Sequence, residues 1–166
     1  MAAKHSDIIK FFTILAIIHS KINHKPDDRH FFQIELNDFL NGSFKVKGYN
    51  MIFEVMPIKF EGVDFDHPWK IREVAFIIIK SLEKVEKAFI SEAFDECEEI
   101  MDDILSAINK HKAGNLTPNF TFDINSIEAH QVTDGKNFGI RCLIDIKSIY
   151  NFNVIPEHWN IYDYSD

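Results

Sequence analysis

The sequence has little of what disulfide-stapled, flexible or membrane-spanning proteins need. Its 166 residues include only two cysteines, five prolines and six glycines, which indicates an ordered chain with little flexible linker. Cys97 and Cys142 lie too far apart to form a short metal-ligand pair, and a small secreted scaffold would carry more thiols. We therefore expect both cysteines to be buried, free thiols. The longest uninterrupted apolar runs, residues 14–18 and 74–79, are far shorter than a membrane span.

Positive charge is also scarce. The chain has 18 Lys and Arg against 26 Asp and Glu, a net charge of −8, which disfavours a protein that coats nucleic-acid phosphates. The stretch from Ile8 to Ile18 superficially imitates a signal peptide, but Lys10 and Thr13 interrupt it and no small-residue cleavage site follows. We expect a soluble, intracellular protein with no sequence-specific nucleic-acid partner and no membrane partner.

What the sequence does have is apolar and aromatic residues. Hydrophobic residues make up 46% of the chain and 16 residues are Phe, enough to bury the core of one domain. Apolar residues at three- and four-residue spacing predict a helix over residues 7–22. Alternating apolar and polar residues predict strands over residues 32–37 and 51–56, with a turn at Asn41-Gly42 after the first.

The middle of the chain predicts a loop followed by a buried strand. Pro57 is expected to end the preceding strand, and residues 57–70 to form a loop that carries several aromatic residues. A third strand is expected at residues 71–80. Its centre, residues 74–79, is apolar at every position, which is typical of a central strand buried on both faces, although a buried helix is the alternative for so short a run.

The second helix is expected between Ser91 and Lys112. It combines one apolar stripe with acidic residues on its other faces and in its first turns. Lys110 and Lys112 fall in its last turn and Gly114 at the expected C-terminal cap, so both ends are predicted to complement the helix dipole.

The last third predicts a long hairpin. Its outgoing arm covers residues 120–132 with a kink at residues 125–126, and a turn at residues 134–135 leads to a return arm at residues 138–147. The element order α-β-β-β-α-β-β lacks the regular alternation of a doubly wound fold. It predicts an α+β fold with two main helices packed on a largely antiparallel sheet.

We expect residues 1–150 to form a single α+β domain and residues 151–166 to form an aromatic and acidic C-terminal extension.

No motif for catalysis or cofactor binding is present. The chain has no Gly-x-Ser-x-Gly elbow, no Gly-x-Gly-x-x-Gly and no Walker-type sequence, and Cys97 falls on an apolar stripe. His19, His24 and His30 are close in sequence, but Pro26 separates them and no regular face presents all three, so no metal site is expected. We expect a protein that is not an enzyme and has no cofactor and no metal.

A metal-dependent nuclease is the enzymatic alternative. Pro26-Asp27 and Asp145-x-Lys147 loosely echo a motif whose carboxylates and lysine converge on a magnesium ion. The two parts are separated by most of the chain, and Asp145 and Lys147 fall on the polar face of a strand.

The remaining features that could serve a function are the charged surfaces and the aromatic residues outside the expected core. The acidic helix contrasts with a locally basic region around the first helix, and separate surfaces of opposite charge suit head-to-tail contacts that close into rings. Aromatic residues in loops and in the tail are natural interface anchors. The candidate interface residues are Lys10, Lys21, Lys25, Arg29, Phe60, Phe65, Trp69, Glu92, Asp95, Glu96, Glu99, Asp102, Asp103 and Trp159.

Three stretches carry a family resemblance. They are Trp69-Lys-Ile-Arg-Glu-Val-Ala-Phe-Ile-Ile-Ile, Glu98-Glu-Ile-Met-Asp-Asp-Ile-Leu and Asn137-Phe-Gly-Ile-Arg-Cys-Leu-Ile-Asp-Ile. With the order of elements over residues 7–150, they resemble the tail-terminator and tail-completion proteins of tailed bacteriophages. The resemblance implies a structural protein of the virion, assembled in the host cytoplasm. It implies a homohexameric ring that caps the tail tube at the head–tail junction, with the chain itself, tail-tube proteins and neck or connector proteins as partners. It transfers no catalytic residue.

Two other hypotheses about the function remain as alternatives. One is the small metal-dependent enzyme described above, and the other is a soluble adaptor that binds a basic partner through its acidic helix.

Overall fold

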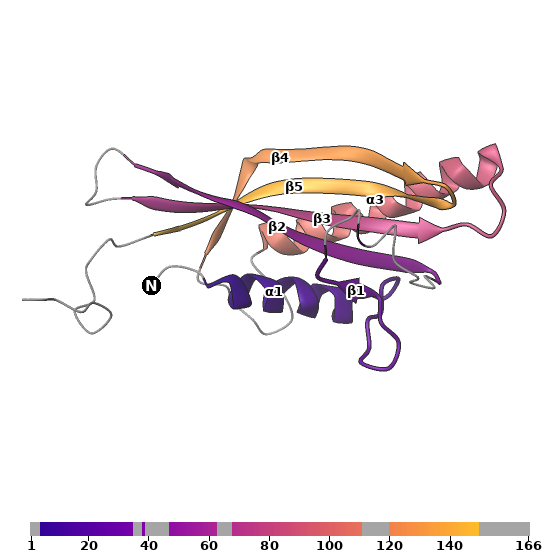
Figure 1. Ribbon diagram of the computed structural model, residues 1–166, viewed down its shortest axis with the longest axis horizontal. Helices are drawn as coiled ribbons and strands as arrows, with labels where there is room; N and C mark the ends of the chain where they lie inside the picture. Colours follow the sequence, from indigo (N-terminus) through magenta and orange to yellow (C-terminus); the bar gives the residue numbers. More distant parts are fainter. Residues whose placement is uncertain (1–3, 35–37, 39–46, 63–67, 111–119, 150–166) are drawn as a thin grey trace, which may run out of the picture.

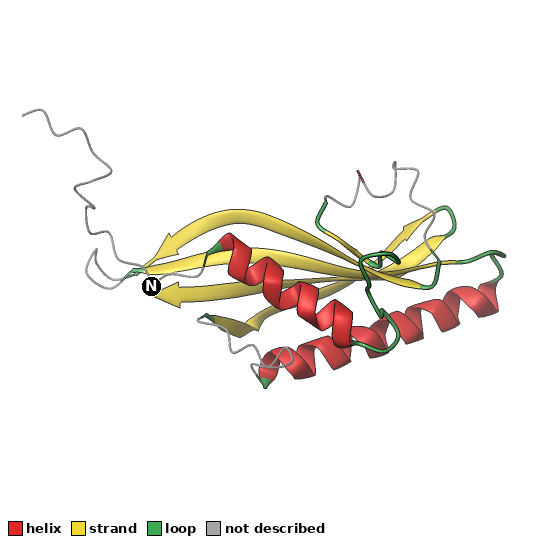
Figure 2. Cartoon of the chain, turned by 90° about the horizontal axis from the view of Figure 1, so that it is seen from below, coloured by secondary structure: helices red, strands yellow, loops and turns green. Residues whose placement is uncertain are grey.

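In the described part of the chain, two helices pack on one face of a five-stranded sheet (Figures 1 and 2). The computed structural model describes residues 4–34, 38, 47–62, 68–110 and 120–149. The elements in chain order are α1 (His5–Ile18), β1 (Phe31–Phe32), β2 (Tyr49–Glu61), β3 (Trp69–Ser81), α3 (Lys87–Asn109), β4 (Thr121–Asp134) and β5 (Asn137–Ile149).

The strand order in the sheet is β1-β2-β3-β5-β4. The short β1 runs parallel to β2, and the other three neighbouring pairs are antiparallel. The expected α+β class, the element order and the largely antiparallel sheet are therefore confirmed. In the described parts of the chain, neither helix combines the length and the apolar character that crossing a bilayer requires.

The central position of β3 confirms the expectation for residues 74–79, all of which are buried. Phe76 and Ile78 point into the layer between the sheet and the helices. Ile77 and Ile79 point to the opposite face, where they cluster with Ile52 of β2. A strand with apolar residues at every position is thus explained by burial on both sides of the sheet.

The two helices bury their apolar stripes against the same face of the sheet. The α1 residue Phe12 is fully buried, with its ring centroid 4.5 Å from that of Phe53 and 5.7 Å from that of Phe76. On α3, Cys97 and Ile104 are buried against the same core. Cys97 and Cys142 are both buried free thiols, as expected.

The element boundaries differ from the prediction at several points. The first helix ends at Ile18, short of residue 22. The second begins at Lys87 and ends at Asn109, so its first turn holds no acidic residue and its last turn no basic one, and the predicted match of charges to the helix dipole is wrong. The earlier start is accompanied by partial burial of Ile90, which lies before Ser91 and packs against a small cluster of Leu82, Ala93 and Phe138.

The largest difference concerns residues 57–70, which are strands over much of their length. The strand β2 continues through Pro57 to Glu61, and β3 begins at Trp69, so the expected loop is wrong at both of its ends, while residues 63–67 lie outside the described part. A register shift between Val55 and Ile58 accommodates the proline, because a residue at a bulge need not donate a hydrogen bond to the ladder.

The predicted hairpin of the last third is confirmed, with its kink. Pairing between β4 and β5 shifts register between Asp123 and Glu128. The hydroxyl of Ser126 closes this bulge: it donates to the carbonyl of Asp123 at 2.7 Å and accepts the backbone N–H of Asp145 at 2.7 Å. Gly135, at φ 56°, provides the tight turn to β5.

Several expected features lie outside the described residues. They are the turn at Asn41-Gly42, the cap at Gly114 and the extension over residues 151–166. The strand expected at residues 32–37 is wrong at residues 33–34, because β1 covers only Phe31–Phe32, and residues 35–37 are outside the described part.

Candidate assembly surface

The end of the β2–β3 hairpin concentrates exposed apolar side chains. Ile58 and Phe60 on β2, Trp69 at the start of β3 and Ile149 at the end of β5 are 43%, 49%, 42% and 69% exposed. Figure 1 shows this end of the sheet reaching past the N-terminal end of α1, beyond the layer that the helices cover. We call these four residues the projecting hairpin end. Large side chains gathered on one uncovered projection suit a contact with another molecule better than the stability of a lone chain.

The apolar residues of the projecting hairpin end occupy both faces of the strands. Trp69 and Ile149 are direct cross-strand partners, while Ile58 is the partner of Arg72, and Phe60 of Lys70. Since cross-strand partners share a face of the sheet, Ile58 and Phe60 stand beside two cations.

The two cations are incompletely solvated. Burial lowers the pKa of Arg72, and its buried Nε has no hydrogen-bond partner. Burial, followed by the charge of Arg72, lowers the pKa of Lys70. Positive charge held next to exposed apolar surface favours an acidic, apolar partner.

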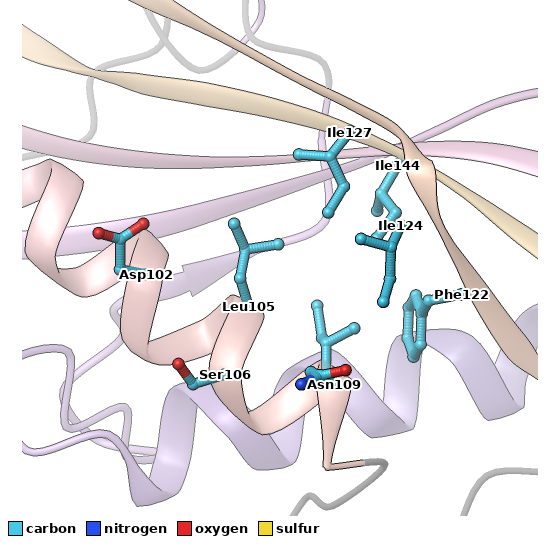
Figure 3. Close-up of a pocket in the computed structure, with 9 residues that line it drawn as sticks. Asp102, Leu105, Ser106, Asn109, Phe122, Ile124, Ile127 and Ile144 are labelled. Atoms are coloured by element: carbon cyan, nitrogen blue, oxygen red, sulfur yellow. The ribbon is translucent and has the colours of Figure 1, made fainter.

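A second uncovered apolar feature is a groove between α3 and β4, which we call the α3–β4 groove (Figure 3). Its volume is about 470 Å³. It is lined by Asp102, Leu105, Ser106, Ile108, Asn109, Phe122, Ile124, Ile127 and Ile144. The bulge in β4 creates its outer wall, because Ile124 and Ile127 lie within the segment that is out of register with β5. Ile124 remains 60% exposed although Figure 3 shows it facing the groove.

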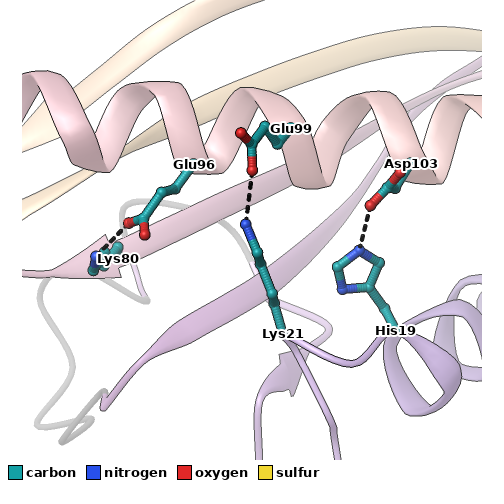
Figure 4. Close-up of polar contacts among 6 residues, drawn as sticks. All are labelled: His19, Lys21, Lys80, Glu96, Glu99 and Asp103. Carbon is teal, nitrogen blue, oxygen red and sulfur yellow. Dashed lines mark hydrogen bonds and ion pairs between the residues drawn. The ribbon is translucent and has the colours of Figure 1, made fainter.

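The acidic helix is partly neutralised within the chain itself (Figure 4). The Nζ of Lys21 lies 2.8 Å from the carboxylate of Glu99, and the Nε2 of His19 lies 3.3 Å from that of Asp103. Lys80 of β3 binds Glu96. The expectation that basic and acidic residues form separate surfaces is therefore wrong at this junction, where the exit of α1 packs against α3.

The electrostatics of this junction follow from these pairs. The hydrogen bond to Glu99 raises the pKa of Lys21. Burial would raise the pKa of Glu96, but hydrogen bonds with Lys80 and Tyr49 outweigh it and lower that pKa. Burial, reinforced by Glu96, raises the pKa of Tyr49 to about 12. These ion pairs link α3 to the segment that follows α1 and to β3.

The other candidate interface residues are either exposed or outside the described part of the chain. Those exposed at the surface are Lys10, Lys25, Arg29, Glu92, Asp95 and Asp102. Phe65 and Trp159 lie outside the described residues. Phe60 and Trp69 are exposed at the projecting hairpin end, in strands and not in a loop.

Sequence reasoning missed Ile58, Lys70, Arg72 and Ile149 at this end, and all the apolar lining of the groove. The alternation Ile58-Lys-Phe60 on one side of Gly62 and Trp69-Lys-Ile71 on the other was a signal for the hairpin.

The residues of the nuclease alternative have other partners. Lys147 and Asp123 form an ion pair at 2.7 Å, which lowers the pKa of Asp123. Burial and the neighbouring Glu73 raise the pKa of Asp145. Asp27 is exposed in the segment between α1 and β1, and β1 is at the other edge of the sheet from β4.

The three histidines near the first helix do not converge on one point, because His19 contacts α3 while His24 and His30 contact each other. His19 binds Asp103 on α3, whereas His30 lies 3.3 Å from Asp28 and 3.1 Å from Asn50. The ring of His24 accepts the backbone N–H of His30. Across the described residues, no group of three or more His, Cys, Asp or Glu side chains could hold a metal ion.

The fold and surfaces define an α+β protein with two uncovered apolar features. No protein-family model matches the chain, and no curated protein matches it in sequence.

Proposed function

We propose that this chain is a non-enzymatic structural subunit that assembles with copies of itself. The observation that carries the proposal is the gathering of Ile58, Phe60, Trp69 and Ile149, all more than 40% exposed, on a projection that the helices leave uncovered. Aromatic and aliphatic residues in such a position act as anchors when they enter a pocket on a partner.

We further propose that the assembly is a ring at the head–tail junction of a tailed bacteriophage, where it caps the tail tube. The resemblance to tail-terminator proteins supports this, and so does a compact α+β subunit with two uncovered apolar features. A hexameric ring is the form that the resemblance implies. The partners would be tail-tube and neck proteins, the site of assembly the host cytoplasm, and the final location the virion.

Light scattering on the purified protein, together with electron microscopy of the protein mixed with tail tubes, tests both parts of the proposal. We expect rings in solution or rings that form at tube ends. A chain that stays monomeric at all concentrations and also fails to bind tail tubes would refute the proposal.

Incubation with DNA and magnesium or manganese tests the enzymatic alternative in parallel. Cleavage that disappears on Asp145→Ala and Lys147→Ala would favour a nuclease over a structural subunit.

A further inference from the structure

We infer that the projecting hairpin end of one copy docks in the α3–β4 groove of a second copy. This inference rests on the proposed self-assembly and names the two surfaces that make the contact. They lie on different elements, and in the proposed ring the contact is head-to-tail: each copy presents the hairpin end to one neighbour and the groove to another.

Apolar surface is the first ground for pairing them. Ile58 and Phe60 are 43% and 49% exposed, and the groove offers a matching apolar lining in Leu105, Ile124 and Ile127. Insertion of an exposed aromatic ring into an apolar groove removes both surfaces from water, which is the main source of binding free energy in such contacts.

Charge is the second ground. Arg72 and Lys70 share a face with Ile58 and Phe60, while Asp102 stands at the rim of the groove. Glu98 and Asp95, also exposed, continue the acidic surface along α3 at helical spacing from Asp102. The cations beside the apolar residues of the hairpin end therefore have a carboxylate partner beside the apolar residues of the groove.

The geometry of the sheet disfavours the same contact within one copy. Ile58 on β2 is two strand spacings, about 10 Å, from β5, which carries Ile144 of the groove, and three spacings, about 14 Å, from the outer wall on β4. The hydrogen-bonded ladder from Ile58 to Glu61 keeps the hairpin end extended, so it cannot fold back over its own groove.

Cross-linking of two variants, each with one added surface cysteine, tests the inference. Phe60→Cys and Ile124→Cys, one of them tagged, are mixed at a concentration where the protein self-associates, oxidised and run on a non-reducing gel. We expect a mixed disulfide dimer. Cys97 and Cys142 do not interfere, because both are buried and burial raises the pKa of each to about 12.

The matched control pairs Phe60→Cys with Val85→Cys. Val85 is 49% exposed before the start of α3, outside both surfaces, and we expect little mixed dimer with it. Equal cross-linking in both mixtures, while light scattering still shows assembly, would overturn the inference and leave the proposed function standing. A protein that self-associates neither in solution nor at the ends of tail tubes would remove both.

Charge exchange gives an independent test. Asp102→Arg and Arg72→Glu should each weaken self-association about tenfold, and the double variant should recover most of the loss. No recovery in a double variant that unfolds at the wild-type temperature would count against the contact. Protection of the Ile124→Cys thiol from a maleimide in the monomer would also overturn it, because the groove would then be closed to a second copy.

Discussion

Phe12 packs α1 against the sheet, and its truncation should remove a large part of the free energy of unfolding. Its ring is fully buried and lies 4.5 Å from that of Phe53, 5.7 Å from that of Phe76 and 5.8 Å from that of Phe11, measured between centroids. Truncation of a buried Phe to Ala typically costs about 3–5 kcal/mol. Four close aromatic neighbours, with Phe122 at 6.2 Å, favour the upper half of that range, about 4 kcal/mol.

Urea unfolding followed by circular dichroism measures this loss at a concentration where the chain is monomeric. With a denaturant slope of about 2 kcal/mol per molar, Phe12→Ala should lower the midpoint by roughly 2 M. The control is Phe89→Ala on α3, where the ring is 42% exposed and the change should stay within about 0.5 kcal/mol. If the two variants lose similar free energy, Phe12 does not hold the helix as described.

Three further predictions concern the sheet and the thiols. In thermal melts, Asp145→Asn should stabilise the protein at pH 7 and have no such effect at pH 3. Burial and acidic neighbours raise the pKa of Asp145, so its ionised form lowers the stability of the fold at pH 7. That loss vanishes at pH 3, where Asp145 is protonated in both the folded and the unfolded state. Wild-type Cys97 and Cys142 should stay unreactive toward a thiol reagent at pH 8 and react only on unfolding; rapid labelling of the native protein would contradict their burial. Gly139→Ala should destabilise by at least 1–3 kcal/mol, roughly the cost of overpacking, because a Cβ would collide with the carbonyl of Ile78; an unchanged urea midpoint would refute that close approach.

The sequence predicted the parts of the fold whose signals are local. A run of six apolar residues at positions 74–79 identified the central strand, because only a strand covered on both faces buries them all. The kink in β4 was predictable from Asn125 and Ser126, which favour local hydrogen bonds over the ladder. Helix α3 was predicted as an element but not at its ends, since Ile90, which lies before the predicted start, packs against Ala93 and Phe138.

The candidate surface depended on contacts that sequence cannot show. Lys21 and Glu99 are far apart in the chain, so their pairing, which cancels charge expected at the surface, follows only from the packing of α1 on α3. Pro57 signalled a strand end, and only the bulge allows β2 to continue and carry Phe60 outward. The α3–β4 groove has no sequence signature, because it exists where the bulged strand parts from the helix.

The most direct test of the account is sedimentation velocity over a range of protein concentrations, with wild type beside Phe60→Ser/Trp69→Ser. Wild type should form a larger species as concentration rises. The double variant removes two of the four exposed anchors and should need about thirtyfold more protein to reach the same state, the loss expected of one strong interface anchor. Both side chains are more than 40% exposed, so its thermal unfolding should change little. Identical sedimentation of the two proteins would contradict the claim that the projecting hairpin end builds the assembly.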